Sequence, residues 1–165
     1  MLKYALPLLY TVKPSVVFGM LRRRLGEIIP LNKLLGIEIV SIGEGTAEAR
    51  LPFRPEVTNH IGSVHATAIF GLAEAASGGA MSGAFAPVML SVRAVAGSAV
   101  VRFLKVARSD LVARARLTAD AGVLRTELDK AGKVVFDVVV EVQDAGGANI
   151  AELTVAWHVT RDRSG

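Results

Sequence analysis

Residues 64–81 constrain the fold most, because they predict an α-helix with apolar or small side chains on almost every side. Glu74 is the one charged residue in this run. A helix that is apolar all round is enclosed rather than half exposed. It therefore needs walls on all sides, which a curved antiparallel sheet can supply. Ser63 directly precedes the run and is expected to cap the helix.

Strand-like alternation of apolar and polar residues surrounds this helix in the sequence. Two strands precede the helix, joined by a turn at residues 43–45, and four strands follow it, the first bent at Gly97. The predicted strands are residues 36–42, 46–53, 88–107, 111–118, 134–142 and 151–159. A chain of 165 residues has the usual size of one domain. This order predicts an α+β hotdog fold, in which the antiparallel sheet wraps round one long central helix.

Residues 1–35 are predicted to be an N-terminal helical extension, and residues 36–162 a single hotdog domain. Apolar residues recur at helical spacing between residues 14 and 29, and Pro30 is expected to end that helix. One interpretation is a helix packed over the edge of the domain. The other is a helix in weak contact with a membrane surface, because the basic residues 22–24 follow the apolar stretch.

The composition and the start of the sequence limit which ligands, partners and cellular compartment are expected. There are no cysteines, which excludes disulfides, thiolate metal sites and cysteine nucleophiles. No His or carboxylate pair has metal-ligand spacing, so no metal is expected. The net charge is +4, but the basic residues are not interleaved with aromatic ones as in proteins that bind single-stranded nucleic acid. Nucleic acid is therefore not expected as a partner either. The start of the chain lacks a convincing secretory signal, and a cytoplasmic protein is predicted.

Glu74 is the first candidate for chemistry. A buried carboxylate is costly unless it is paired or used. One interpretation is a glutamate that reaches solvent or a structural partner. The other is a general base or nucleophile, whose pKa burial would raise.

The start of the helix is the second candidate. Asn59, Gly62, Ser63, His65 and Thr67 cluster within nine positions. Free backbone N–H groups in a first helical turn favour negative charge, such as the oxyanion that develops on a thioester carbonyl. Ordinary capping and turn formation explain the same residues equally well.

The spacing of the two candidates predicts a homo-oligomer. Eight residues separate positions 66 and 74, which is about 12 Å of helix. Oxyanion donors and a base must both lie within about 3 Å of the atoms they serve. Two antiparallel helices related by a two-fold axis bring Glu74 of one chain to the helix start of the other, twice. A dimer or a dimer of dimers with shared sites is therefore expected.

Residues 59–74 resemble the signature of PaaI-like hotdog thioesterases, which reads roughly N-x-x-G-x-x-H-G-G-x-x-x-x-L-A-D/E. The residues in register are Asn59, Gly62, His65, Leu72, Ala73 and Glu74. Residues 101–108 look like the third-strand motif of the same superfamily. The N-terminal extension resembles a hotdog branch known only as a domain of unknown function.

The resemblance implies roles for four residues. Glu74 would be the catalytic carboxylate, activating water or attacking the thioester carbonyl. Asn59 would position the water or the substrate, and His65 with the N–H of Ala66 would serve the thioester oxygen. The chain departs from the pattern at Ala66 and Thr67, which replace two glycines and narrow the approach.

Substrate contacts are expected at the helix start and on the third strand. Gly62 and Thr67 are the candidates at the helix start. Arg102, Lys105 and Arg108 would meet the phosphates of coenzyme A, although a solvated strand face explains them as well. No cofactor is expected beyond coenzyme A as part of the substrate.

Hydrolysis of acyl-CoA or acyl-carrier thioesters is the predicted function. The alternative is a non-catalytic acyl-CoA or lipid-binding hotdog protein, favoured by the substitutions at Ala66 and Thr67. A hotdog dehydratase resembles the chain less around the histidine and the positions after it.

Overall fold

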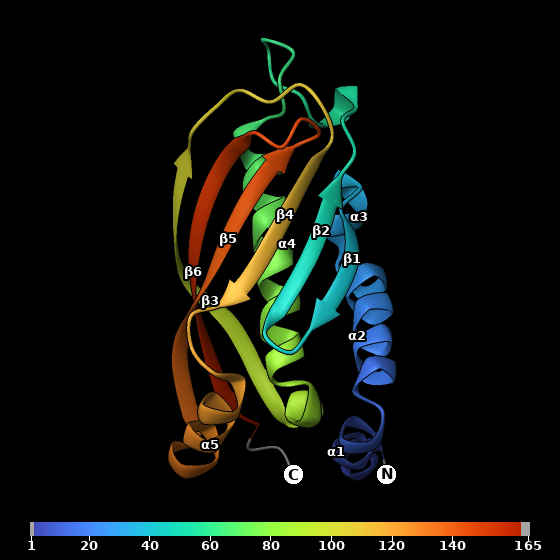
Figure 1. Ribbon diagram of the computed structural model, residues 1–165, viewed down its shortest axis with the longest axis vertical. Coiled ribbons are helices and arrows are strands. Elements are labelled where there is room, and N and C mark those ends of the chain that lie inside the picture. The colour runs from blue at the N-terminus through green and yellow to red at the C-terminus, as the bar shows by residue number, and fades with distance from the viewer. Residues whose placement is uncertain (1, 163–165) are drawn as a thin grey trace.

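A six-stranded antiparallel sheet curves round helix α4 (Ala66–Ala84), as Figure 1 shows. The structure is a computed structural model and describes residues 2–162. The strand order is β1-β2-β4-β5-β6-β3. The strands are β1 (Glu38–Gly43), β2 (Thr46–Leu51), β3 (Val92–Phe103), β4 (Leu111–Leu117), β5 (Lys133–Asp144) and β6 (Asn149–Arg161). The predicted hotdog fold is confirmed.

Helices at the N-terminus cover one edge of the sheet. They are α1 (Leu2–Val12), α2 (Pro14–Ile28) and α3 (Pro30–Leu35). Helix α2 lies along β1 and α4. Residues 14–29 therefore pack over the edge of the domain, which was the first of the two interpretations of this segment. Pro30 separates α2 from α3 and is also the first residue of α3. Proline suits a first helical position, because the backbone N–H there forms no hydrogen bond within the helix.

The core forms where alternating strand residues meet the small side chains of α4. On β2, Ala47, Ala49 and Leu51 are buried, whereas the residues between them point outward or are half-buried. Glycines on α4 permit close approach: a Cβ at Gly79 would lie 2.9 Å from that of Ala47. Helix α4 and the sheet pack this closely because glycine, and not a large apolar residue, stands at the point of contact.

Helix α4 begins later than predicted, and Ser63 does not cap it. His65 is the N-cap, and its Nδ1 accepts a hydrogen bond of 3.0 Å from the N–H of Thr67. Val64 is held in an extended conformation, because it bridges to Thr58 and its N–H donates to the carbonyl of Ala107 at 2.9 Å. These contacts delay the helix to Ala66 and leave Ser63 buried before it.

A fifth α-helix, α5 (Ala121–Ala131), lies between the predicted strands 111–118 and 134–142, in a segment for which no element was predicted. Asp120 caps it by accepting a 2.9 Å bond from the N–H of Val123. Leu124 and Leu128 bury one face, and Gly132 ends the helix at φ 70°. Asp120 and Gly132 are ordinary start and stop signals of a helix.

The sheet leaves one stripe of α4 incompletely covered, contrary to the expectation of full enclosure. The residues of this stripe are Thr67, Phe70, Gly71, Glu74 and Gly78, which recur at helical spacing. Most of the remaining residues of α4 are buried. Glu74 therefore occupies the middle of the one face of α4 that its own chain leaves partly open.

Strand β3 is a long edge strand. Within residues 2–162 it pairs with β6 alone, so its other edge carries unpaired backbone groups. Val95, Val100 and Phe103 are exposed along it. The predicted bend at Gly97 appears as a register shift between Ala96 and Ser98.

Two further helical turns are short 3-10 segments. They are η1 (Pro55–Val57) before the loop that leads to α4, and η2 (Ala86–Ser91) between α4 and β3. None of the helices within residues 2–162 has the length and apolar character needed to cross a membrane.

Candidate active site

Glu74 lies in a small pocket between α4, the N-terminal helices and the sheet, which we call the Glu74 pocket. It has a volume of about 180 Å³. Its walls include Leu25, Ile29, Met89 and Trp157. Among residues 2–162, no side chain forms an ion pair or hydrogen bond with the carboxylate. Burial raises the pKa of Glu74 above its ordinary value, since apolar surroundings disfavour the charged form.

Asn32 of α3 lines the same pocket and was not anticipated from the sequence. The residue is 3% exposed, and its side-chain Nδ2 has no hydrogen-bond partner within the described part of the chain. A buried donor without a partner costs about 1–3 kcal/mol, so such a group calls for a ligand or a water. The available signal was a polar residue in the otherwise largely apolar α3.

A hydrogen-bonded pair steadies the turn of α4 that carries Glu74. The Ser77 hydroxyl donates to the backbone carbonyl of Glu74 at 2.7 Å. The indole Nε1–H of Trp157 donates in turn to the Ser77 oxygen at 3.3 Å. Both side chains are buried, which fixes the backbone from which Glu74 projects.

The start of α4 presents two hydrogen-bond donors to solvent. Since Nδ1 of His65 accepts the capping bond, the neutral ring carries its proton on Nε2. The N–H of Ala66 has no partner within residues 2–162. His65, Ala66 and Thr67 are all exposed. These two donors are suited to a developing oxyanion at a helix N-terminus.

Asn59 and Gly62 shape the loop before α4. The side-chain Nδ2 of Asn59 donates to the Ser63 hydroxyl at 2.8 Å, and its Oδ1 accepts from the N–H groups of Ile61 and Ser63 at 3.1 and 3.2 Å. Gly62 has φ 70°, which favours glycine. Within the chain, the Asn59 amide thus bonds locally and sets the position of the helix start.

The three basic candidates occupy different surroundings. Arg108 donates to the carbonyl of Ile61 at 3.3 Å and so lies beside the loop before α4. Arg102 on β3 pairs with Glu152 at 3.3 Å, and Lys105 is exposed on the loop after β3. The structure therefore brings Arg108 to the helix start.

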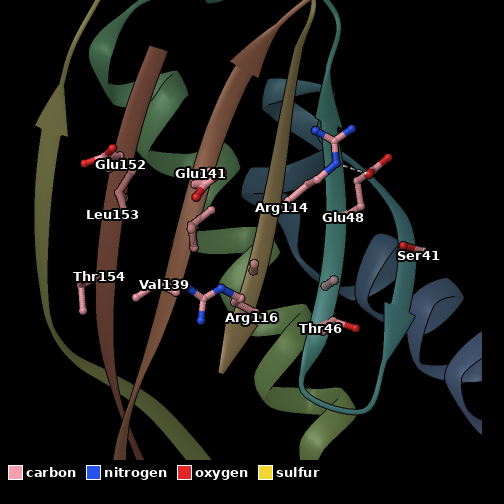
Figure 2. Close-up of a pocket in the computed structure, with 13 residues that line it drawn as sticks. Ser41, Thr46, Glu48, Arg114, Arg116, Val139, Glu141, Glu152, Leu153 and Thr154 are labelled. Atoms are coloured by element: carbon pink, nitrogen blue, oxygen red, sulfur yellow. Dashed lines mark hydrogen bonds and ion pairs between the residues drawn. The ribbon is translucent and has the colours of Figure 1, made fainter. Parts of the chain in front are cut away.

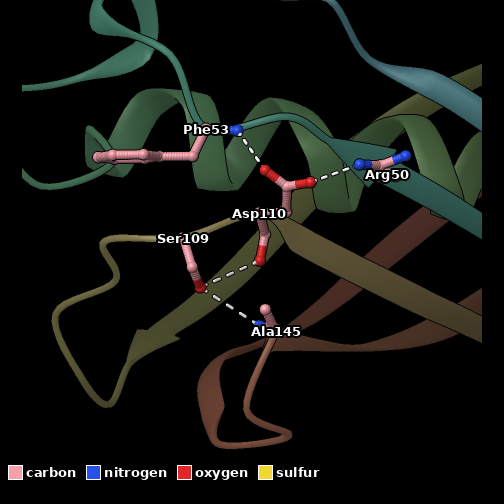
Figure 3. A network of polar contacts seen from close by, with 5 residues as sticks. All are labelled: Arg50, Phe53, Ser109, Asp110 and Ala145. Atoms are coloured by element: carbon pink, nitrogen blue, oxygen red, sulfur yellow. Dashed lines mark hydrogen bonds and ion pairs between the residues drawn. The ribbon is translucent and has the colours of Figure 1, made fainter.

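An ionic contact fixes the loop that leads toward α4, as Figure 3 shows. Asp110 accepts from the guanidinium of Arg50 and, at 2.8 Å, from the N–H of Phe53. These bonds hold the pKa of the Asp110 carboxyl below its ordinary value, the bond from Arg50 contributing most. The contact ties the end of β2 to the start of β4.

A second concavity lies on the outer face of the sheet, turned away from α4 (Figure 2). Its volume is about 520 Å³. Arg114 pairs there with Glu48 at 2.9 Å and donates to Gln143, also at 2.9 Å. Charges of both signs line this hollow, and the sheet separates it from Glu74. In residues 2–162, no group of three or more His, Cys, Asp or Glu side chains could hold a metal ion.

The helix start and Glu74 remain apart within one chain. The structure gathers Asn59, Gly62, His65 and Arg108 at one end of α4. Glu74 lies eight positions along the helix from Ala66, or about 12 Å. A single chain therefore does not bring the base and the oxyanion donors to one carbonyl.

Solved structures share this fold over most of the chain. A protein of unknown function from Pseudomonas aeruginosa, described as a probable thioesterase, is 26% identical with a TM-score of 0.74, covering 87% of this chain and 95% of its own. The E. coli PaaI protein from the phenylacetic acid degradation operon is 22% identical with a TM-score of 0.68, and the match covers 90% of this chain and 95% of the PaaI chain. A Haemophilus influenzae thioesterase is 18% identical with a TM-score of 0.68, and the match covers 86% of this chain and 91% of that one. The last two likenesses show the fold alone.

Sequence comparison gives the family. No curated protein shows significant sequence similarity to the chain. The profile of the family described as domain of unknown function (DUF4442) matches residues 20–159, which include α3, the loop before α4 and Glu74. The chain therefore belongs to the DUF4442 family, an uncharacterised branch with the fold of PaaI and other hotdog thioesterases.

Proposed function

We propose that the protein hydrolyses acyl-CoA or acyl-carrier thioesters at two sites shared by the subunits of a homodimer. The observation that carries the proposal is the carboxylate of Glu74, which lies in an apolar pocket on the open stripe of α4 and has no ion pair or hydrogen bond within residues 2–162. A raised pKa brings a carboxylate closer to the value that suits a general base near neutral pH. The solved relative described as a probable thioesterase supports the same reaction class.

Glu74 acts on water in this proposal. Its carboxylate takes a proton from the water while the oxygen attacks the thioester carbon. The resulting oxyanion accepts hydrogen bonds from the N–H of Ala66 and Nε2–H of His65 of the other subunit. The C–S bond then breaks, the thiolate leaves and takes a proton, and the products are a carboxylic acid and a free thiol. The other route is direct attack by Glu74 on the thioester carbon, in which the thiolate leaves, an anhydride forms and water then hydrolyses it. Labelled water oxygen enters the Glu74 side chain when that water attacks the Glu74 carbon of the anhydride.

Two surfaces of the single chain favour the dimer. The stripe on α4 exposes Thr67 and leaves Glu74 half-buried. Beside it, β3 offers an unpaired edge with exposed Val95 and Val100. Long exposed edge strands commonly pair with a second chain. A two-fold axis through this region sets the two α4 helices antiparallel and joins each Glu74 to the partner's helix start.

Mixing two inactive variants tests the shared site. Glu74→Gln removes the base, whereas Ala66→Pro removes one N–H at a position where proline suits a helix. Each homodimer is expected to lose about a hundredfold or more in kcat. Random mixed dimers regain one intact site each, so equal mixing should restore about a quarter of the normal rate. Hydrolysis assays after co-refolding measure it, and a strictly monomeric mass or no recovery would contradict the shared site.

In this proposal Asn32 holds the attacking water by turning its amide toward it. Asn32 lines the Glu74 pocket, and its buried Nδ2 has no hydrogen-bond partner within residues 2–162. Asn32→Leu is expected to lower kcat about tenfold to a hundredfold through lost positioning. The free energy of unfolding should stay level or rise, because the change removes a buried donor without a partner.

A second substitution separates this role from a structural one. Asn32→Asp places another carboxyl beside Glu74 and should move the rising limb of the pH–rate profile to higher pH. Urea unfolding and pH profiles of both variants measure these effects. An Asn32→Leu protein that is destabilised but has normal kcat would assign Asn32 to packing.

Acyl-CoA or lipid binding without turnover is the second candidate function. The side chains of Ala66 and Thr67 at the exposed helix start favour it, since they narrow the approach to the oxyanion donors. Such a protein would bind acyl-CoA without releasing thiol, and Glu74→Gln would leave its affinity unchanged. Arg108 would meet the phosphates of coenzyme A in either case.

A further inference from the structure

A larger pocket lies between α1, α2 and η2, next to the Glu74 pocket. Its volume is about 660 Å³, within the range of small-molecule sites. Aliphatic or thioether side chains form its interior: Leu6, Val17, Met20, Leu21, Met89 and Leu90. Charged side chains at residues 23, 24 and 27 also line it. We call it the tail pocket.

The tail pocket and the Glu74 pocket share a wall. Met89 of η2 lines both of them. On α2, Leu21 lines the tail pocket and Leu25, one turn further along, lines the Glu74 pocket. The two pockets therefore adjoin each other at Met89 and along this face of α2. Methionine suits a wall that a ligand must move aside, since its unbranched side chain adapts easily.

We propose that the tail pocket binds the hydrocarbon chain of an unbranched aliphatic acyl group whose thioester lies at Glu74. This inference rests on the proposed function and gives its substrate class: medium-chain to long-chain acyl thioesters. The lining contains no aromatic ring to stack on an aryl group and offers aliphatic surface instead. A butyryl group ends within the small Glu74 pocket, whereas a dodecanoyl group extends past Met89.

Chain-length profiles of kcat/KM test the tail pocket. For the unaltered protein, each pair of methylenes that becomes fully buried should raise kcat/KM by about fifteenfold, until the pocket is filled. Met20→Trp fills the pocket from α2, and Leu90→Trp fills it from η2. Each is expected to lower the ratio of dodecanoyl-CoA to butyryl-CoA kcat/KM at least about tenfold.

Val16→Trp is the matched control. Val16 lies on α2 near Met20, and the two residues have similar exposed fractions, 44% for Val16 and 39% for Met20. Unlike Met20, Val16 does not line the tail pocket. It should leave the dodecanoyl-to-butyryl ratio unchanged. A ratio that falls equally in the control would assign the effect to general damage and overturn the proposal.

A binding measurement separates failure of the tail pocket from failure of the thioesterase proposal. Calorimetry of Glu74→Gln with the dodecyl and butyl thioethers of coenzyme A should show tighter binding of the dodecyl compound, and Met20→Trp should remove that preference. Length-dependent binding without any hydrolysis by the unaltered protein would reject the thioesterase and keep the tail pocket. Hydrolysis with a chain-length ratio unaffected by both tryptophan variants would keep the thioesterase and reject the tail pocket.

Discussion

Glu74→Gln is expected to lower kcat for acyl-CoA hydrolysis by about a thousandfold while the protein stays folded. Glutamine keeps the size of the side chain but cannot take a proton from water. The measurement is thiol release across acyl-CoAs of several chain lengths. Glu141→Gln is the control, because it removes an exposed carboxylate on the outer face of the sheet. Unchanged turnover of Glu74→Gln would remove hydrolysis by this carboxylate from consideration.

The pH dependence of the unaltered protein follows from the sign of the pKa shift of Glu74. Burial raises the pKa of Glu74, so hydrolysis should rise with pH along a limb above the ordinary range of a glutamate. The folded state holds this proton to higher pH than the unfolded state does. The free energy of unfolding should therefore fall as pH rises between the ordinary and the raised pKa. Glu74→Gln lacks this loss and should be at least as stable as the unaltered protein at pH 8.

Gly83→Ala is expected to cause the largest loss of stability. A Cβ at Gly83 would lie 1.9 Å from the backbone carbonyl oxygen of Gly43, at the hairpin between β1 and β2. Backbone cannot move aside as a flexible side chain can, so the last turn of α4 must separate from the sheet. The expected cost is about 3 kcal/mol, or a melting temperature lower by about 10 °C.

Gly78→Ala on the same helix is the matched comparison. Its added Cβ would lie 3.6 Å from the Trp157 ring, an ordinary contact. Alanine favours a helix over glycine by up to about 1 kcal/mol, so stability should stay level or rise. Thermal unfolding of both variants measures the difference. Equal melting temperatures would mean that α4 does not approach β1 as closely as the structure shows.

Local patterns in the sequence were sufficient for the main elements of the fold. The apolar run around Glu74 predicted the central helix, and strict alternation predicted the strands that became β2, β5 and β6. These signals are local, because periodicity reports which face of an element is buried. The motif residues from Asn59 to Glu74 likewise lie close together in the sequence. Helix α5 was missed although its cap at Asp120 and its stop at Gly132 were present.

Tertiary contacts decided the details that position the site. The start of α4 depends on a bond between Val64 and Ala107, residues far apart in the sequence. Asn32 and Met89 reach the pocket of Glu74 only because α3 and η2 pack against α4.

The sequence by itself determined a helix with one carboxylate in its middle, a hydrogen-bonding start and a sheet to surround it. The tertiary structure decided which face of that helix stays open and which distant residues line the pocket there. The physical reason is that burial along one element follows from its own periodicity, whereas contact between elements depends on how closely their surfaces pack. At α4, that packing is set by glycines whose neighbours the linear sequence does not reveal.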